Sequence, residues 1–161
     1  MALRDTLRAA SAQAVRDVRV DDDRVNLIAR WQASVIAVED EIARWLAEFV
    51  REDSLAIELQ DVEIDEDSLG PYTVQAMTLR AGTRVVRLQP IARVVVGAAG
   101  RIDMYRQGLL HQAIRYTLIR TIDDAQGGWC LRPPPEPGQT APNLEPLTRD
   151  RFEAALDALL R

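Results

Sequence analysis

The sequence predicts an α+β fold in which an N-terminal helical hairpin precedes an antiparallel sheet and a C-terminal helix packs on that sheet. Three observations support this prediction. Apolar residues recur at helical spacing in residues 1–51, they alternate with polar residues in residues 54–132, and helical spacing returns in residues 148–161. The length of 161 residues suits a single domain, 1–161, with a proline-rich surface segment at residues 133–147.

The first helix of the expected hairpin covers residues 3–18. Its apolar positions lie three or four residues apart: Leu3, Leu7, Ala10 and Ala14. The run from Asp21 to Asp23 is expected to end this helix and to cap the next one. Carboxylates suit that place because they accept hydrogen bonds from the free N–H groups of a helix start and meet the positive end of its dipole.

The second helix, residues 24–51, carries a seam with heptad-like spacing. The seam residues are Leu27, Trp31, Val35, Val38, Ile42, Trp45 and Phe49. Such spacing favours packing against a partner helix, and a helix about 40 Å long exceeds the needs of a compact core. Two interpretations stay open: the seam packs within its own chain, or part of it meets another subunit. Trp31, Val38 and Trp45 are the partner-binding candidates of the second interpretation.

The middle of the chain is expected to form a meander of about five to seven short antiparallel strands. The expected strands are residues 55–64, 72–79, 84–89, 91–96, 101–105, 114–122 and 129–131. The alternation changes phase near Gln60, which indicates a β-bulge or two short strands. Pro90 is expected to end the third strand because it has no N–H to donate. Gly97 and Gly100 mark a hairpin loop. Thr148 is expected to cap the C-terminal helix.

Charge is divided unevenly along this meander. Residues 52–67 hold eight acidic side chains and no basic one, whereas residues 80–120 hold eight arginines and a single acid, Asp103. Opposite charges on paired strands would stabilise the sheet and set its register. In the other interpretation, the arginines form a surface for phosphate or for an acidic partner. The partner-binding candidates are then Arg84, Arg87, Arg93 and Arg101.

Composition excludes several kinds of chemistry. All twenty basic residues are arginine, so Schiff-base lysines and a phosphate-binding Walker lysine are absent. The single Cys130 and single His111 exclude an internal disulfide and argue against a cysteine- or histidine-based zinc site. No cofactor is expected. No apolar run reaches the length that spans a bilayer, and the charged start is no secretory signal, so a cytoplasmic location is expected.

One arrangement of carboxylates suggests an enzyme. Asp61 and Glu63 lie at period two, so a strand would place them on one face. With Asp103 as a further ligand they could hold magnesium or manganese for phosphoester hydrolysis, and His111 could serve as a base. This is the alternative hypothesis: a metal-dependent enzyme or enzyme relic acting on nucleic acid. A related alternative is an arginine-rich sheet that binds nucleic acid without cleavage.

The leading expectation is a small cytoplasmic, non-enzymatic protein-binding module. It would be an adaptor, an immunity protein or a chaperone-like accessory protein, acting in a larger assembly or as a homo-oligomer. The long seam helix, the net charge of −5 and the lack of a recognisable catalytic motif favour it.

Overall fold

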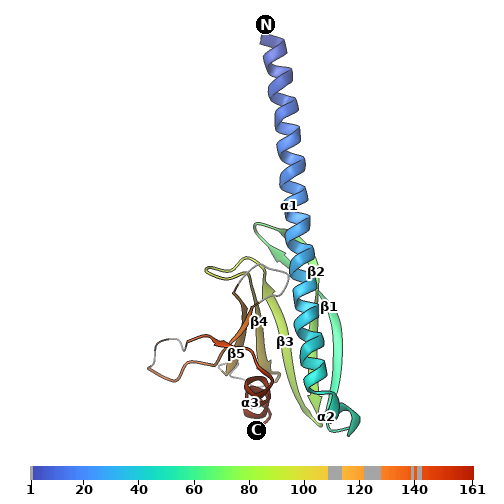
Figure 1. The fold of residues 1–161 in the computed structure, drawn as a ribbon, viewed down its shortest axis with the longest axis vertical. Helices are drawn as coiled ribbons and strands as arrows, with labels where there is room; N and C mark the ends of the chain where they lie inside the picture. Colours follow the sequence, from blue (N-terminus) through green and yellow to red (C-terminus); the bar gives the residue numbers. More distant parts are fainter. Residues whose placement is uncertain (1, 109–113, 122–127, 139, 141–142) are drawn as a thin grey trace.

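The computed structural model describes residues 2–108, 114–121, 128–138, 140 and 143–161 (Figure 1). Within these residues one long helix is followed by a short one, a seven-stranded antiparallel sheet and a final helix. The helices are α1 (Ala2–Trp45), α2 (Ala47–Arg51) and α3 (Arg149–Leu160). The strands are β1 (Ala56–Glu66), β2 (Gly70–Ala81), β3 (Arg84–Ala92), β4 (Gly100–Arg106), β5 (Arg115–Arg120), β6 (Trp129–Arg132) and β7 (Glu145–Pro146).

Each strand pairs with the next one along the chain, so the sheet order β1 to β7 follows the sequence. The longest hairpin is formed by β1 and β2, whose register runs without a shift from Ala56 opposite Arg80 to Glu66 opposite Gly70. Gly82 has a φ of 60° and makes the tight turn into β3. The predicted α+β fold with an antiparallel meander is confirmed.

The helical hairpin is not confirmed, because one continuous helix occupies its place. Asp21 to Asp23 lie inside α1, which runs unbroken from Ala2 to Trp45. A cap residue leaves the helical conformation, but residues 2–45 contain no glycine or proline that would force the chain out of it. The three aspartates therefore project from a helix surface.

Two strand predictions also need correction. The phase change near Gln60 produces neither a bulge nor a break, because β1 pairs with β2 over its whole length. Pro90 does not end a strand but lies inside β3, which continues to Ala92, so the separate strand expected over residues 91–96 does not form. The missing N–H of Pro90 is tolerated because the pairing of β3 with β2 stops at Leu88, and because the register with β4 shifts between Pro90 and Ala92.

The core lies between one face of the sheet and two helices. Strand residues that share this face by register are buried: Leu79 lies opposite Val86, and Leu88 lies between Met77 and Met104. They form one cluster with the C-terminal half of α1 and with α3. The contributing residues are Trp31, Val35, Val38 and Ile42 of α1, Leu46 between α1 and α2, and Phe152, Ala155, Leu156 and Leu159 of α3.

The N-terminal half of α1 takes no part in this core. Every residue from 2 to 23 is exposed, and Figure 1 shows this stretch running straight away from the sheet. We call residues 2–23 the arm. Contact with the sheet begins at Arg24, whose Nη1 donates a hydrogen bond to the carbonyl of Leu69 at 2.8 Å. Across the described parts of the chain, no helix combines the length and the apolar character needed to cross a membrane.

Candidate protein-binding surfaces

The arm is held in helical form by its own side chains. Its sequence is rich in alanine and arginine, which favour the helix. The Gln13 amide donates to Asp17 at 2.7 Å, and Arg16 donates to the Gln13 carbonyl oxygen at 2.9 Å. Most helical stability in proteins comes from packing an apolar face, and the exposed residues of the arm have no such packing within the described chain. The arm therefore resembles a segment whose helix is stabilised by contact with a partner.

An apolar stripe along the arm provides such a face. Leu3, Leu7 and Val18 are 71%, 58% and 60% exposed. Helical spacing places Leu3, Leu7, Ala14 and Val18 along one side of α1, with the small residues Ala10 and Ser11 between them. Contiguous exposed apolar side chains of this kind mark interaction sites. The stripe was recognised in the sequence, but its partner was expected inside the hairpin.

The residues proposed from the seam have a different place. Trp31 and Val38 are buried in the core of their own chain. Trp45 packs against that core, with its ring centroid 5.9 Å from that of Phe152. Trp31 and Val38 are therefore covered by their own chain, whereas Trp45 is partly exposed and Phe49, at the end of the seam, is 37% exposed. The seam spacing arose because α1 packs across a sheet and beside α3, which requires a narrow apolar face just as a partner helix does.

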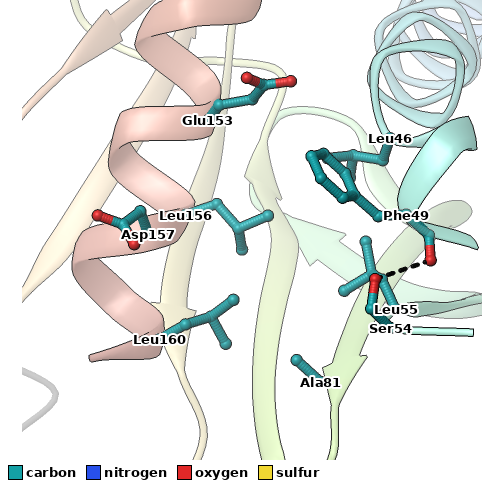
Figure 2. A pocket seen from close by; sticks show the side chains of 9 residues that line it. All are labelled: Leu46, Phe49, Ser54, Leu55, Ala81, Glu153, Leu156, Asp157 and Leu160. Carbon is teal, nitrogen blue, oxygen red and sulfur yellow. Dashed lines mark hydrogen bonds between the residues drawn. The ribbon is translucent and has the colours of Figure 1, made fainter. Parts of the chain in front are cut away.

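An apolar groove opens between α2, the start of β1 and α3 (Figure 2). Its volume is about 340 Å³, and it is lined by Leu46, Phe49, Ser54, Leu55, Ala81, Glu153, Leu156, Asp157 and Leu160. Figure 2 shows Leu156 and Leu160 of α3 directed across the groove towards Phe49 and Leu55. Shape and lining suit an apolar side chain of a partner.

The acids of the groove are already paired within α3. Arg149 Nε lies 2.9 Å from Glu153 Oε1, and Arg161 Nη2 lies 2.7 Å from Asp157 Oδ2. These exposed pairs between neighbouring turns contribute little to stability. The groove therefore offers a mainly apolar surface with a nearly neutral margin.

The second face of the sheet carries an ion-pair cluster on β4 and β5. Asp103 is buried and accepts hydrogen bonds from two guanidinium groups. Arg101 Nε lies 2.7 Å from its Oδ1, and Arg115 Nη1 lies 3.0 Å from its Oδ2. The Arg115 guanidinium also stacks 5.0 Å from the centre of the Tyr105 ring. The cluster satisfies the buried carboxylate and joins two neighbouring strands.

The remaining candidate arginines are placed separately. Arg87 is buried and donates to Thr78, Gln60 and Gln89. Arg84 lies at the start of β3, where its Nη1 donates to the carbonyl of Leu160 at the end of α3. Arg93 is half-buried, and its backbone N–H donates to Glu66 at 2.9 Å. Arg80 Nη2 and Glu58 Oε2, 3.5 Å apart, are one instance of the expected charge pairing between the acidic stretch and the arginines.

A smaller hollow on the second face lies beside Arg101. It has a volume of about 210 Å³ and is bordered by Arg101, Thr117 and Arg132 together with residues 95–98. Two guanidinium groups and a hydroxyl could bind a small anion. The Arg101 fork, however, is already engaged by Asp103.

The expected metal ligands are not brought together. Asp61 and Glu63 lie on β1, whereas Asp103 lies on β4, with β2 and β3 between them. Three strand spacings amount to about 14 Å, and Asp103 is occupied by arginine. Within the ranges that the structure describes, no group of three acidic, histidine or cysteine side chains could hold a metal ion. His111 lies outside those ranges.

Sequence reasoning missed two buried acids, Glu39 and Glu66. Glu39 of α1 is 1% exposed, and the amide of Gln75 on β2 donates to its Oε2 at 2.7 Å. Burial raises the pKa of Glu39 to about 7, while the Gln75 hydrogen bond opposes the rise. The signal was present, because Glu39 lies four residues after Val35 and three before Ile42, at the spacing of the core face.

Comparisons with protein-family models, curated protein sequences and solved structures find no match to this chain.

Proposed function

We propose that this chain is a small cytoplasmic, non-enzymatic protein-binding module of the adaptor, immunity or chaperone-like kind. The arm is its binding element. The observation that carries this proposal is the exposure of every residue from 2 to 23 in a helix that bears an apolar stripe. The apolar groove beside α3 supports it as a second place where a partner's side chain could dock.

The physical reason is that the arm lacks tertiary packing and leaves its apolar side chains exposed to water. A helix without tertiary packing is marginal, and full burial of a leucine or valine side chain stabilises by roughly 1.5–3 kcal/mol. Covering Leu3, Leu7 and Val18 therefore stabilises both the contact and the helix that presents them. A partner that lays its own apolar face along α1 would use helix-to-helix recognition.

The test replaces the stripe and leaves the rest of the chain intact. In the variant Leu3→Gln/Leu7→Gln the stripe loses its largest side chains, whereas the control Ala9→Gln/Ala12→Gln changes the opposite side of the arm. Both are compared with the unchanged chain by affinity recovery from the native source and by size-exclusion chromatography with light scattering. We expect the stripe variant to lose associated protein and the control to keep it.

Two results would count against this proposal. Equal recovery of a partner by the unchanged chain and the stripe variant would show that the arm is not the binding element. A chain that stays monomeric and recovers no partner would contradict the function itself.

A second candidate rests on the ion-pair cluster of the second face. Arg101 binds Asp103 through Nε and Nη2, yet its side chain stays 40% exposed, and this exposed part could contact a phosphate. Fluorescence anisotropy with a labelled single strand, at about 50 and 200 mM salt, tests this, because phosphate contacts weaken steeply as salt rises. Binding that is absent or independent of salt rejects it.

A further inference from the structure

We propose that the partner of the arm is a second copy of this chain, lying antiparallel to the first. This inference rests on the proposed function of the arm and names its occupant. Two arms would lie side by side along the stripe, with the two sheets at opposite ends of the paired helices. Three features of the arm point to this arrangement: the symmetry of its stripe, the order of its charges and its length.

The stripe positions read the same from either end. Leu7, Ser11, Ala14 and Val18 follow each other by steps of four, three and four, and the same series continues by steps of four to Leu3 at one end and to Asp22 at the other. When a second helix is turned end for end, Leu7 therefore comes opposite Val18 of the other copy, and Ser11 comes opposite Ala14. Each position repeats across the two-fold axis, as an interface between identical copies requires. The small residues at the centre let the helices approach closely.

The distribution of charge along the arm also favours an antiparallel pair. Its first half carries Arg4 and Arg8 against one acid, Asp5. Its second half carries Arg16 and Arg19 against four acids, which are Asp17, Asp21, Asp22 and Asp23. An antiparallel pair brings the positive half of each arm to the negative half of the other. A parallel pair in register would bring like charges together, which is unfavourable.

This arrangement also gives the aspartate run a partner. In the antiparallel register, Asp22 lies beside Arg4 and the first turn of the other copy's α1. That turn carries the positive end of the helix dipole, where carboxylates are stabilising. The aspartates would thus serve a helix start, but on the neighbouring molecule. Two such contacts form, one at each end of the overlap.

The length of the arm fits the overlap. About 20 paired residues span roughly 30 Å, and the other copy's helix would begin beside Asp22. The next residues of α1 are already in contact with the sheet, since Arg24 binds the carbonyl of Leu69 at the turn between β1 and β2. The exposed residues 2–23 of α1 therefore coincide with the residues that overlap in this antiparallel register. A parallel pair would instead crowd both sheets at one end.

Cysteine pairing distinguishes the two directions. In a Cys130→Ser background, chains with Leu7→Cys are mixed with chains with Val18→Cys under mild oxidation. We expect a disulfide between the two kinds of chain and little between two Leu7→Cys chains. A predominant bond between two Leu7→Cys chains indicates a parallel pair and overturns the inference.

Charge exchange is an independent test of register. Arg4→Asp and Asp22→Arg are each expected to weaken self-association by about tenfold, and the double variant is expected to restore much of it. Ala12→Gln, on the far side of the arm, is the control. Sedimentation equilibrium of the full chain provides the measurement. Two single variants that weaken association without rescue would contradict the antiparallel register.

The outcomes also separate this inference from the proposed function. If the purified chain is monomeric at every concentration while the stripe variant still loses a recovered partner, the arm binds a different protein and the second copy is excluded. If the chain is monomeric and the stripe variant changes nothing, both proposals fail. A dimer that persists unchanged in the stripe variant places the contact elsewhere and overturns this inference.

Discussion

Glu39 shows how a single side chain can set the pH response of the molecule. It is buried between α1 and β2, with Gln75 as its hydrogen-bond donor and with Asp40 and Arg87 as its charged neighbours. Burial raises its pKa to about 7 from an ordinary value of 4.5. Between these values the folded chain holds a proton that the unfolded chain has released.

This difference predicts a loss of stability as pH rises. Because the folded state binds more protons between pH 4.5 and about 7, the free energy of unfolding should fall across that window and stay low above it. The contribution is about 3 kcal/mol, from the size of the pKa shift. Urea unfolding at several pH values measures it. Glu39→Gln should remove most of the decline, whereas Asp40→Asn, at the exposed neighbouring position, should keep it.

Gly100 is fixed by the tryptophan behind it. A Cβ atom at Gly100 would lie 2.7 Å from the Cε3 atom of Trp31 and closer still to Cζ3. Trp31 has no exposed surface and cannot move aside. Gly100→Ala is therefore expected to destabilise the chain by about 3 kcal/mol through overpacking and strain.

The matched control for this substitution is Gly97→Ala. Gly97 has a φ of 74°, but no atom lies within 4 Å of an added Cβ. It should cost only the backbone strain, about 1 kcal/mol. Thermal unfolding compares the two variants. Equal shifts in melting temperature would show that the contact with Trp31 is not what requires glycine at position 100.

Single residues were predictable where a local rule applies and not where the contact is distant. Thr148 was expected to cap a helix, and its hydroxyl accepts a hydrogen bond from the N–H of Arg151 at 3.2 Å. Gly100 was expected only to turn the chain, because nothing in the sequence tells that Trp31 lies behind it. Asp103 was expected to join Asp61 and Glu63, but strand order separated them.

At the scale of elements, α3 depends on that cap. Its first turn has free N–H groups, and the Thr148 oxygen satisfies one of them. Thr148→Ala should destabilise by about 1 kcal/mol, whereas Thr148→Ser retains the acceptor and should cost much less. Chemical denaturation of both variants provides the comparison. A loss that is equal for alanine and serine would assign the effect to the threonine methyl group.

At the scale of elements, strand boundaries were predictable where glycine turns separate the strands. The turn at Gly82 separated β2 from β3 as expected and the meander followed, but the strand expected before Gly97 did not form. The prediction from the aspartate run was wrong because aspartate occurs both as a helix cap and at ordinary exposed positions of a helix. The sequence alone does not distinguish these two places. Pro90 misled for a similar reason: proline ends a strand only if its N–H position is needed, and here the strand pairing stops short of it.

At the scale of the whole molecule, the arginines of residues 80–120 follow neither of the two interpretations of the uneven charge. The arginines neither gather on one surface nor all pair with the acidic stretch. Arg84 binds the end of α3, Arg87 is enclosed by polar side chains, and Arg101 serves Asp103. Such dispersal could not be predicted, because it depends on strand order and on the position of α3.

The acidic stretch forms one border of the sheet. Within the described residues β1 pairs only with β2, so its other side presents eleven residues of unpaired backbone. A long exposed strand of this kind is a template for intermolecular strand addition, and charged side chains are a common protection. Pairing of the β1 strands of two molecules would bring the acids Glu58, Asp61, Glu63 and Asp65 of one copy close to the same acids of the other.

We therefore expect the acidic side chains of β1 to oppose aggregation of the chain. Asp61→Asn/Glu63→Gln/Asp65→Asn should leave the fold intact but raise turbidity and thioflavin binding on prolonged incubation. Glu48→Gln/Glu52→Gln/Glu136→Gln removes the same charge outside the strand and should not. If both variants precipitate alike, net charge alone keeps the chain dispersed. The feature that first resembled a metal site would then act by preventing the growth of fibrils from the border of the sheet.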